Sequence, residues 1–164
     1  MLSRRSRERF AWCVAGCSLA VAIVAVAADD SARSEYGVSG RGTRWLESPS
    51  GLTVKMLVEQ SNLAGTEVEI GEINFPADYR PSPPHRHGKV EIFYGASGKL
   101  GHTVNGEKHV IEPGMVGIVR PGDTIVHSVE SDEPVKGLVI WTPAGEAETL
   151  IKLGVFKTRP VSED

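Results

Sequence analysis

The stretch PPHRHGKVEIFYGASG, residues 83–98, carries most of the information about the fold. In an extended strand, residues i and i+2 point to the same face, with Cα atoms about 6–7 Å apart. His85 and His87 would then present two imidazoles that can meet at one ion, about 2.0–2.1 Å from each nitrogen. A straight strand would carry Glu91 about 13 Å beyond His87. If Glu91 shares the ion, the chain must turn between them, and Gly88 is where a turn costs least.

The sequence on either side of this stretch predicts an all-β domain. Eighteen Gly and ten Pro separate short runs rich in β-branched residues, and Asn105-Gly106 is the preferred pair for a two-residue hairpin turn. Such spacing is typical of a barrel or two-sheet sandwich, often a jelly roll. We expect strands over residues 52–59, 66–75, 89–94, 99–104, 108–111, 115–120, 124–130 and 135–141, and a short closing helix over 146–153. We expect the core to include Phe93, Tyr94, Met115, Ile118, Ile140 and Trp141, some of which would line any pocket.

His127 is the expected third imidazole. It lies among Ile125, Val126 and Val129, so we expect it to be at least partly buried. A neutral imidazole in an apolar interior needs a partner for each nitrogen, and a metal ion is one such partner. The alternative is a core histidine with ordinary hydrogen bonds.

Three further polar residues are considered for a role at the site. His102 and Asp123 each have two interpretations, and His109 is not expected to take part. His102 shares its face with Leu100 and Val104, so it is either an inward catalytic group, as a donor or proton shuttle, or a core or rim histidine. We expect His109 on the surface of a strand. Asp123 is either a substitute ligand or, more simply, a turn cap.

The order HxHxxxE, followed after six residues by Gly98, resembles the first signature of the cupin superfamily, although Tyr79 stands where that signature opens with Gly. Residues 50–145 as a whole are similar to small single-domain cupins. The resemblance implies a cupin-type jelly-roll β-barrel with a short C-terminal helix. It also implies one divalent transition metal (Mn, Fe, Ni, Cu or Zn) as the cofactor. The ligands it implies are His85, His87, Glu91 and His127.

The second cupin signature is altered. It usually reads Gly-x-x-His, whereas four residues separate Gly122 from His127 here. Two extra residues preserve the alternation of a strand, so His127 is still expected to face inward. They can also shift it along the barrel axis.

Three imidazoles and a carboxylate on an octahedral ion leave two positions open for water, substrate or dioxygen. The chain has no Ser–His–acid or Cys–His arrangement, so the chemistry is expected to be that of the metal. The leading hypothesis is a dioxygenase-like oxidoreductase acting on a small oxygen-rich or aromatic molecule, by resemblance to quercetinase-like cupins. Glu91 would be a ligand or carry a proton. The alternatives are a non-catalytic module that binds a small ligand or metal, and a sugar isomerase or epimerase.

The N-terminus predicts export. Residues 1–9 are basic, residues 10–28 carry no charge, and Ala25-Val26-Ala27 fits a signal-peptidase site. Residues 1–27 are thus a signal peptide or, alternatively, an uncleaved membrane anchor. Either places the domain in the periplasm or outside the cell. We expect a flexible linker over 28–48, the barrel over 49–153 and a tail over 154–164.

The net charge and the positions of the cysteines limit the classes of binding partner that are expected. Both cysteines lie in the leader, so the mature domain has no thiol chemistry. The formal net charge of the whole chain is −3. The leader contains four arginines and one glutamate, so the net charge of the remainder is near −6. This balance argues against nucleic acid or anionic lipid as a partner. We expect a small-molecule partner, and a homodimer formed through edge strands.

Overall fold

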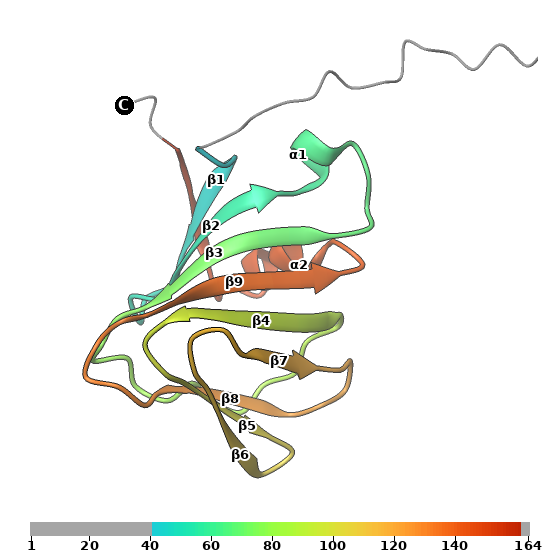
Figure 1. Ribbon diagram of the computed structural model, residues 1–164. Coiled ribbons are helices and arrows are strands. Elements are labelled where there is room, and N and C mark those ends of the chain that lie inside the picture. The colour runs from blue at the N-terminus through green and yellow to red at the C-terminus, as the bar shows by residue number, and fades with distance from the viewer. Residues whose placement is uncertain (1–40, 162–164) are drawn as a thin grey trace, which may run out of the picture. The chain divides into compact units, whose positions relative to one another are not determined.

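The computed structural model describes residues 41–161, which form two antiparallel sheets and two short helices (Figure 1). The larger sheet has the order β10-β1-β2-β3-β9-β4-β7, and the smaller sheet has the order β6-β5-β8. The strands are β1 (Arg44–Glu47), β2 (Thr53–Val58), β3 (Glu69–Phe75), β4 (Val90–Ser97), β5 (Leu100–Val104), β6 (Glu107–Ile111), β7 (Val116–Val119), β8 (Ile125–Val129), β9 (Val135–Thr142) and β10 (Lys157–Pro160); the helices are α1 (Gln60–Leu63) and α2 (Glu146–Lys152).

The predicted all-β jelly roll with one short C-terminal helix is confirmed, with one correction. Within residues 41–161 the two sheets are not hydrogen-bonded into a closed barrel. Outside the named strands, a bridge between His85 and Ile125 connects the approach to β4 with β8. The first helix, α1, was not predicted.

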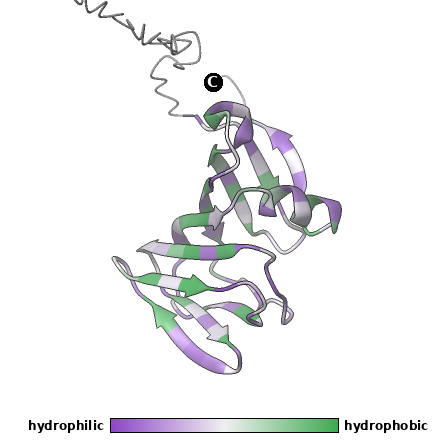
Figure 2. Ribbon diagram, turned by 90° about the vertical axis from the view of Figure 1, so that its right-hand side faces the viewer, coloured by the Kyte–Doolittle hydropathy of each residue, from purple (hydrophilic) through white to green (hydrophobic). Residues whose placement is uncertain are grey.

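Strand alternation builds the core between the two sheets. Along β3 and β9 every second residue is buried, and hydrophobic and hydrophilic residues alternate along the strands in Figure 2. Phe75, Phe93 and Trp141 are among the largest side chains that are almost fully enclosed. The pattern follows from the period of two in an extended chain.

The same alternation shows that three of the expected core residues are exposed. Strand β4 buries Glu91 and Phe93, so Tyr94 points outward; Met115 and Ile118 are likewise exposed. The sequence shows that these residues are apolar, but the phase of the strand decides which face they occupy.

The expected linker and tail each contain a strand, so those predictions were wrong for β1 and β10. The two strands pair with each other at the edge of the larger sheet. Leu46 of β1 is fully buried, and Trp45 lies under Arg159, 5.3 Å from the ring centroid. Strand β10 (KTRP) is exposed at all four positions, so it has no alternation of apolar and polar residues that would mark it. The leader and residues 28–40 of the expected linker lie outside the described residues.

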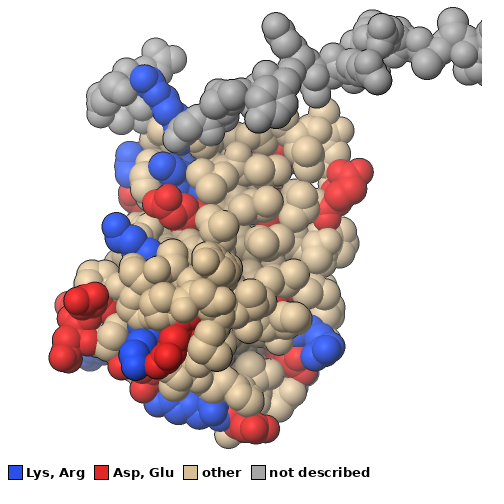
Figure 3. All heavy atoms as spheres, in the orientation of Figure 1, with Lys and Arg blue, Asp and Glu red and all other residues tan. Residues whose placement is uncertain are grey.

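Charged side chains of both signs are interspersed on the face shown in Figure 3, where Lys and Arg form no continuous stripe. None of the helices within residues 41–161 has the length and apolarity needed to cross a membrane.

Gly137 allows β9 to pack between β3 and β4, and we expect Gly137→Ala to destabilise the fold by about 3 kcal/mol, the upper range for overpacking. A Cβ at this position would overlap the Tyr94 carbonyl oxygen and lie 2.6 Å from the Phe93 ring. Urea unfolding of both forms measures the effect. The neighbouring exposed Lys136→Ala is the control, and equal stability of Gly137→Ala and wild type would contradict the packing argument.

Candidate metal centre

The segment before β4 lies along the free edge of β8. The Ser82 N–H donates to the His127 carbonyl, and His85 and Ile125 exchange two backbone hydrogen bonds of 3.0 and 2.8 Å. The chain then bends at Gly88 and Lys89 and enters the larger sheet at Val90. The turn predicted between His87 and Glu91 is therefore present.

Gly88 has no unusual backbone angle, and the space beside it would also admit a Cβ. Its φ is not in the left-handed region. A Cβ on this glycine would lie 3.5 Å from Glu146 Oε2. The bend therefore passes directly beside the carboxylate of Glu146.

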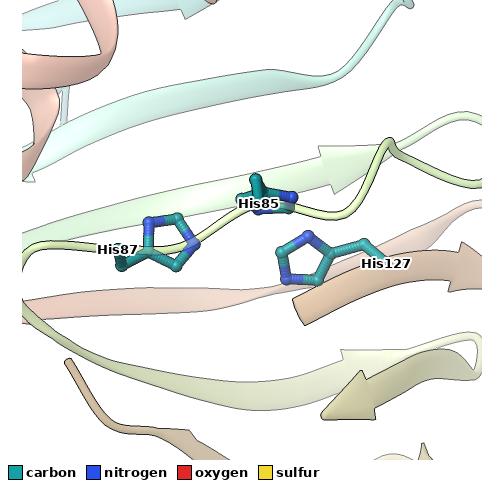
Figure 4. A group of neighbouring side chains, drawn as sticks. All are labelled: His85, His87 and His127. Atoms are coloured by element: carbon teal, nitrogen blue, oxygen red, sulfur yellow. The ribbon is translucent and has the colours of Figure 1, made fainter. Parts of the chain in front are cut away.

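The four predicted ligands gather in one region, where Glu91 is near His87 and His127 but is not grouped with His85. His85, His87 and His127 each offer a nitrogen within 4.8 Å of the others, and Figure 4 shows the three rings gathered from two segments of the chain. Glu91 Oε2 lies 3.1 Å from His87 Nε2, and Glu91 Oε1 lies 3.3 Å from His127 Nε2. Two ligand atoms on one ion lie about 3–4 Å apart when each is about 2.1 Å from it. The two distances to Glu91 fall in this range, and the three imidazole nitrogens lie within 4.8 Å of one another.

Two hydrogen bonds fix which nitrogen of the first two imidazoles faces the centre. His85 Nδ1 donates to the Pro83 carbonyl at 2.9 Å, and His87 Nδ1 donates to Glu146 Oε1 at 3.0 Å. In the neutral rings, Nε2 therefore carries the lone pair on both residues. Neutral imidazoles with Nε2 exposed to a common space are the form that binds metal.

His87 Nε2 provides the test of whether a cation fits. This atom is buried without a hydrogen-bond partner, although Glu91 Oε2 is close by. A lone pair facing a carboxylate oxygen is repulsive, and a proton or a metal ion between the two removes the repulsion. The donor set therefore suits a divalent cation.

The charge states of the ligands follow from their surroundings. Burial disfavours the charged form of Glu91, but the hydrogen bond and charge of His127, with His87 and Trp141, lower its pKa, so Glu91 remains a carboxylate. Burial would lower the pKa of His87, but the bond to Glu146 and the charges of Glu91 and Glu146 raise it. Burial lowers the pKa of His85, and the charges of His127 and His87 add to this lowering.

Two residues of the site were not recognised as such in the sequence. Trp141 is the cross-strand neighbour of Glu91, and its Nε1 donates to Glu91 Oε2 at 3.0 Å. Glu146, at the start of α2, is buried and orients His87. A buried Trp needs an acceptor for its N–H, which was the available signal for Trp141. Glu146 resembled an ordinary acidic residue in a first helical turn.

Glu69, on β3 of the larger sheet, helps to position Glu146 through a hydrogen bond to the next residue of α2. Its buried Oε2 accepts the Ala147 N–H at 3.1 Å, and thus satisfies a donor at the start of α2. Gly145, at the N-cap, has no side chain for this purpose. The position of Glu146 is therefore set by a carboxylate on β3.

The remaining polar candidates separate into one inward residue and two outward ones. His102 is almost fully buried, and burial, together with the charge of His127, lowers its pKa to about 3. His109 is exposed, as predicted. Asp123 accepts hydrogen bonds from Asn105 Nδ2 and the Arg120 N–H, so it caps a turn and is not among the residues that converge on the centre.

A cavity of about 490 Å³ opens onto His85, His87, Glu91 and His127. Its wall is mostly apolar and includes Leu52, Val54, Ile73, Phe75, Trp141, Leu150 and Phe156. Tyr79 also lines it and packs edge-on against Phe75, with ring centroids 5.0 Å apart. The residue that replaces the glycine of the first signature therefore forms part of the pocket.

Residues 71–141 match the cupin domain family. These residues form a cupin domain. Solved structures agree on the fold: an RmlC-like cupin from Shewanella frigidimarina is 22% identical, with 70% of this chain and 96% of that chain covered and a TM-score of 0.55. A predicted oxalate decarboxylase from Thermotoga maritima is 16% identical, with 67% and 99% covered and a TM-score of 0.54.

KdgF from a Halomonas species is also 16% identical to this cupin, with 63% of this chain and 89% of that chain covered and a TM-score of 0.54. The comparison with curated protein sequences gave no match. At these identities the neighbours establish the fold of this cupin, and its chemistry has to be argued from its own site.

We expect Glu146→Ala to lower the affinity for Zn(II) about 10- to 100-fold, the usual effect of removing a partner that orients a metal-bound histidine. Glu146→Gln should lose less, because its amide oxygen still accepts from His87 Nδ1. Competition with a chromophoric chelator measures the affinities. Glu148→Ala on the same helix is the control, since this half-exposed carboxylate pairs with Arg44 instead. Unchanged affinity in folded Glu146→Ala would refute the orienting role.

Proposed function

We propose that this cupin binds one divalent transition metal on His85, His87, Glu91 and His127 and adds dioxygen to a small hydroxylated aromatic molecule. The single observation that carries the proposal is the position of this donor set at the base of a largely apolar cavity. When bound, the ion would supply a Lewis-acidic centre with open positions for substrate and dioxygen. Borderline nitrogen and oxygen ligands suit Mn, Fe, Ni, Cu and Zn, and oxygenation requires a redox-active member of that group.

The cavity wall favours an aromatic substrate over a sugar. Phe75, Phe156 and Trp141 offer ring faces and edges, and the aliphatic residues around them offer no hydrogen bonds. The wall also contains the hydroxyls of Ser48, Ser50 and Ser82, but these already form hydrogen bonds within the protein. A sugar carries a hydroxyl on most carbons, and each hydroxyl buried without a partner costs about 1–3 kcal/mol. A flat molecule with one hydroxyl directed at the histidines would fill the cavity without that cost.

The protein groups have distinct tasks in this scheme. The lowered pKa of Glu91 suits a ligand that stays charged, whereas a proton acceptor works best with a pKa near the working pH. We therefore assign Glu91 to metal binding and, through Trp141, to a fixed orientation. Pro83 and Glu146 hold the first two imidazoles with Nε2 toward the cavity. The apolar wall excludes water from the bound substrate.

The proposed reaction needs no reagent other than the substrate and dioxygen. Dioxygenation places both oxygen atoms in the product, so an external reductant is not required. The cavity therefore has to admit only the substrate and dioxygen.

We expect protein loaded with Fe(II), Mn(II), Ni(II) or Cu(II) to shift the absorption of a flavonol or catechol under anaerobic conditions. After air is admitted, oxygen and substrate should disappear in equal amounts with at least one of these metals. His87→Ala, which removes one ligand, should abolish both signals. Binding without any oxygen uptake would favour a non-catalytic binding module, and epimerisation of an aldose would favour the sugar reaction; either result would contradict the dioxygenase proposal.

We also propose that the domain is exported, because a basic start is followed by an uncharged run that ends in Ala25-Val26-Ala27. We expect the mature protein to begin at Ala28 and to occur in the periplasmic or secreted fraction of a bacterial host. Cell fractionation and N-terminal sequencing measure both properties. An intact N-terminus in the membrane fraction would instead identify an anchor, and full-length protein in the cytoplasm would refute export.

A further inference from the structure

His102 lies next to the proposed metal centre but is not among the residues that line the cavity. It is on β5, directly opposite His127 of β8. The other edge of β8 is occupied by the segment that carries His85. His127 therefore lies between His85 and His102, with ring centroids 5.2 and 5.0 Å away.

The ring of His102 is buried without partners. Its side chain is 2% exposed, and neither ring nitrogen has a hydrogen-bond partner among the described residues. Buried polar atoms are nearly always satisfied, and an unsatisfied one costs about 1–3 kcal/mol. Both ring nitrogens are thus available to a partner outside the protein chain, such as a metal ion or water.

The surrounding backbone leaves space for this ring. Gly117 of β7 packs against it, and a Cβ there would lie 2.8 Å from His102 Nδ1. Phe93 lies on its other side, with ring centroids 5.6 Å apart. Glu91, His102 and His127 offer ligand atoms that all lie within 4.8 Å of one another.

We propose that His102 is a further metal ligand, so that the centre contains two overlapping three-ligand sets joined at His127. The outer set is His85, His87 and His127, which face the cavity. The inner set is Glu91, His102 and His127, of which only His102 does not line the cavity. This inference rests on the proposed metal site and adds a donor that the cupin signatures do not include.

The inner set has a consequence for substrate binding. A substrate oxygen that enters from the cavity meets the outer set first, and His85, which is only half-buried, is the ligand most accessible to displacement. The three inner ligands are unaffected by such a displacement. Five donors would leave one position of an octahedral ion open, and displacement of His85 would open the second position that substrate and dioxygen need.

The test uses the five histidines of the chain as reporters. Full-length protein labelled with ¹⁵N in its histidine rings is titrated with Zn(II), and the ring nitrogen signals are assigned with single His→Gln variants. We expect four histidines, including His102, to acquire metal-bound shifts. The exposed His109, the cross-strand neighbour of His102 on β6, should not move and is the internal control.

Each outcome is informative. If His85, His87 and His127 shift while His102 does not, His102 is a core histidine and this inference fails, but the proposed metal site stands. If no histidine shifts, both fail. In a second measurement, folded His102→Gln should bind Zn(II) at least about tenfold more weakly, whereas His109→Gln should bind it normally. Equal affinity of His102→Gln and wild type would overturn the inference.

Discussion

A carboxylate placed between two sheets has to be matched by donors or cations, and Glu91 imposes this requirement on the structure. His87, His127 and Trp141 surround its two oxygens, from three different segments of the chain. Each of these segments has to hold its position for the negative charge to be tolerated. The contacts of buried Glu91 therefore connect the small sheet, the large sheet and the segment between them. The same negative charge favours the binding of a cation.

The helix at the C-terminal end of the domain belongs to the same network. Glu69 of β3 holds the start of α2, α2 presents Glu146, and Glu146 orients His87. These contacts span 78 and 59 residues of sequence. The sequence predicted α2 only as a helix that closes one end of the sheets. In the structure, α2 also helps to fix His87 with Nε2 toward the metal centre.

Local geometry could be predicted from the sequence, and long-range geometry could not. The spacing of His85 and His87 and the need for a bend near Gly88 follow from the dimensions of a strand, and the bend is present. The inward face of His127 follows from strand alternation. Glu146 could not be found in this way, because nothing near it in the sequence indicates which side chain it meets. Tyr94 was assigned to the core because apolarity does not reveal the phase of a strand.

The contrast between the ligands and the cavity wall supports the proposed preference for an aromatic substrate. Charges interact more strongly next to apolar walls than in water, so a negative oxygen near the proposed ion is favoured most when the rest of the molecule excludes solvent. The apolar wall favours the binding of a flat hydrophobic molecule. Tyr79 is part of this wall and stands where the cupin signature has glycine. A polyhydroxylated ligand meets the same charge but loses hydrogen bonds along the wall. This physical difference is the reason that we propose a hydroxylated aromatic molecule rather than a sugar.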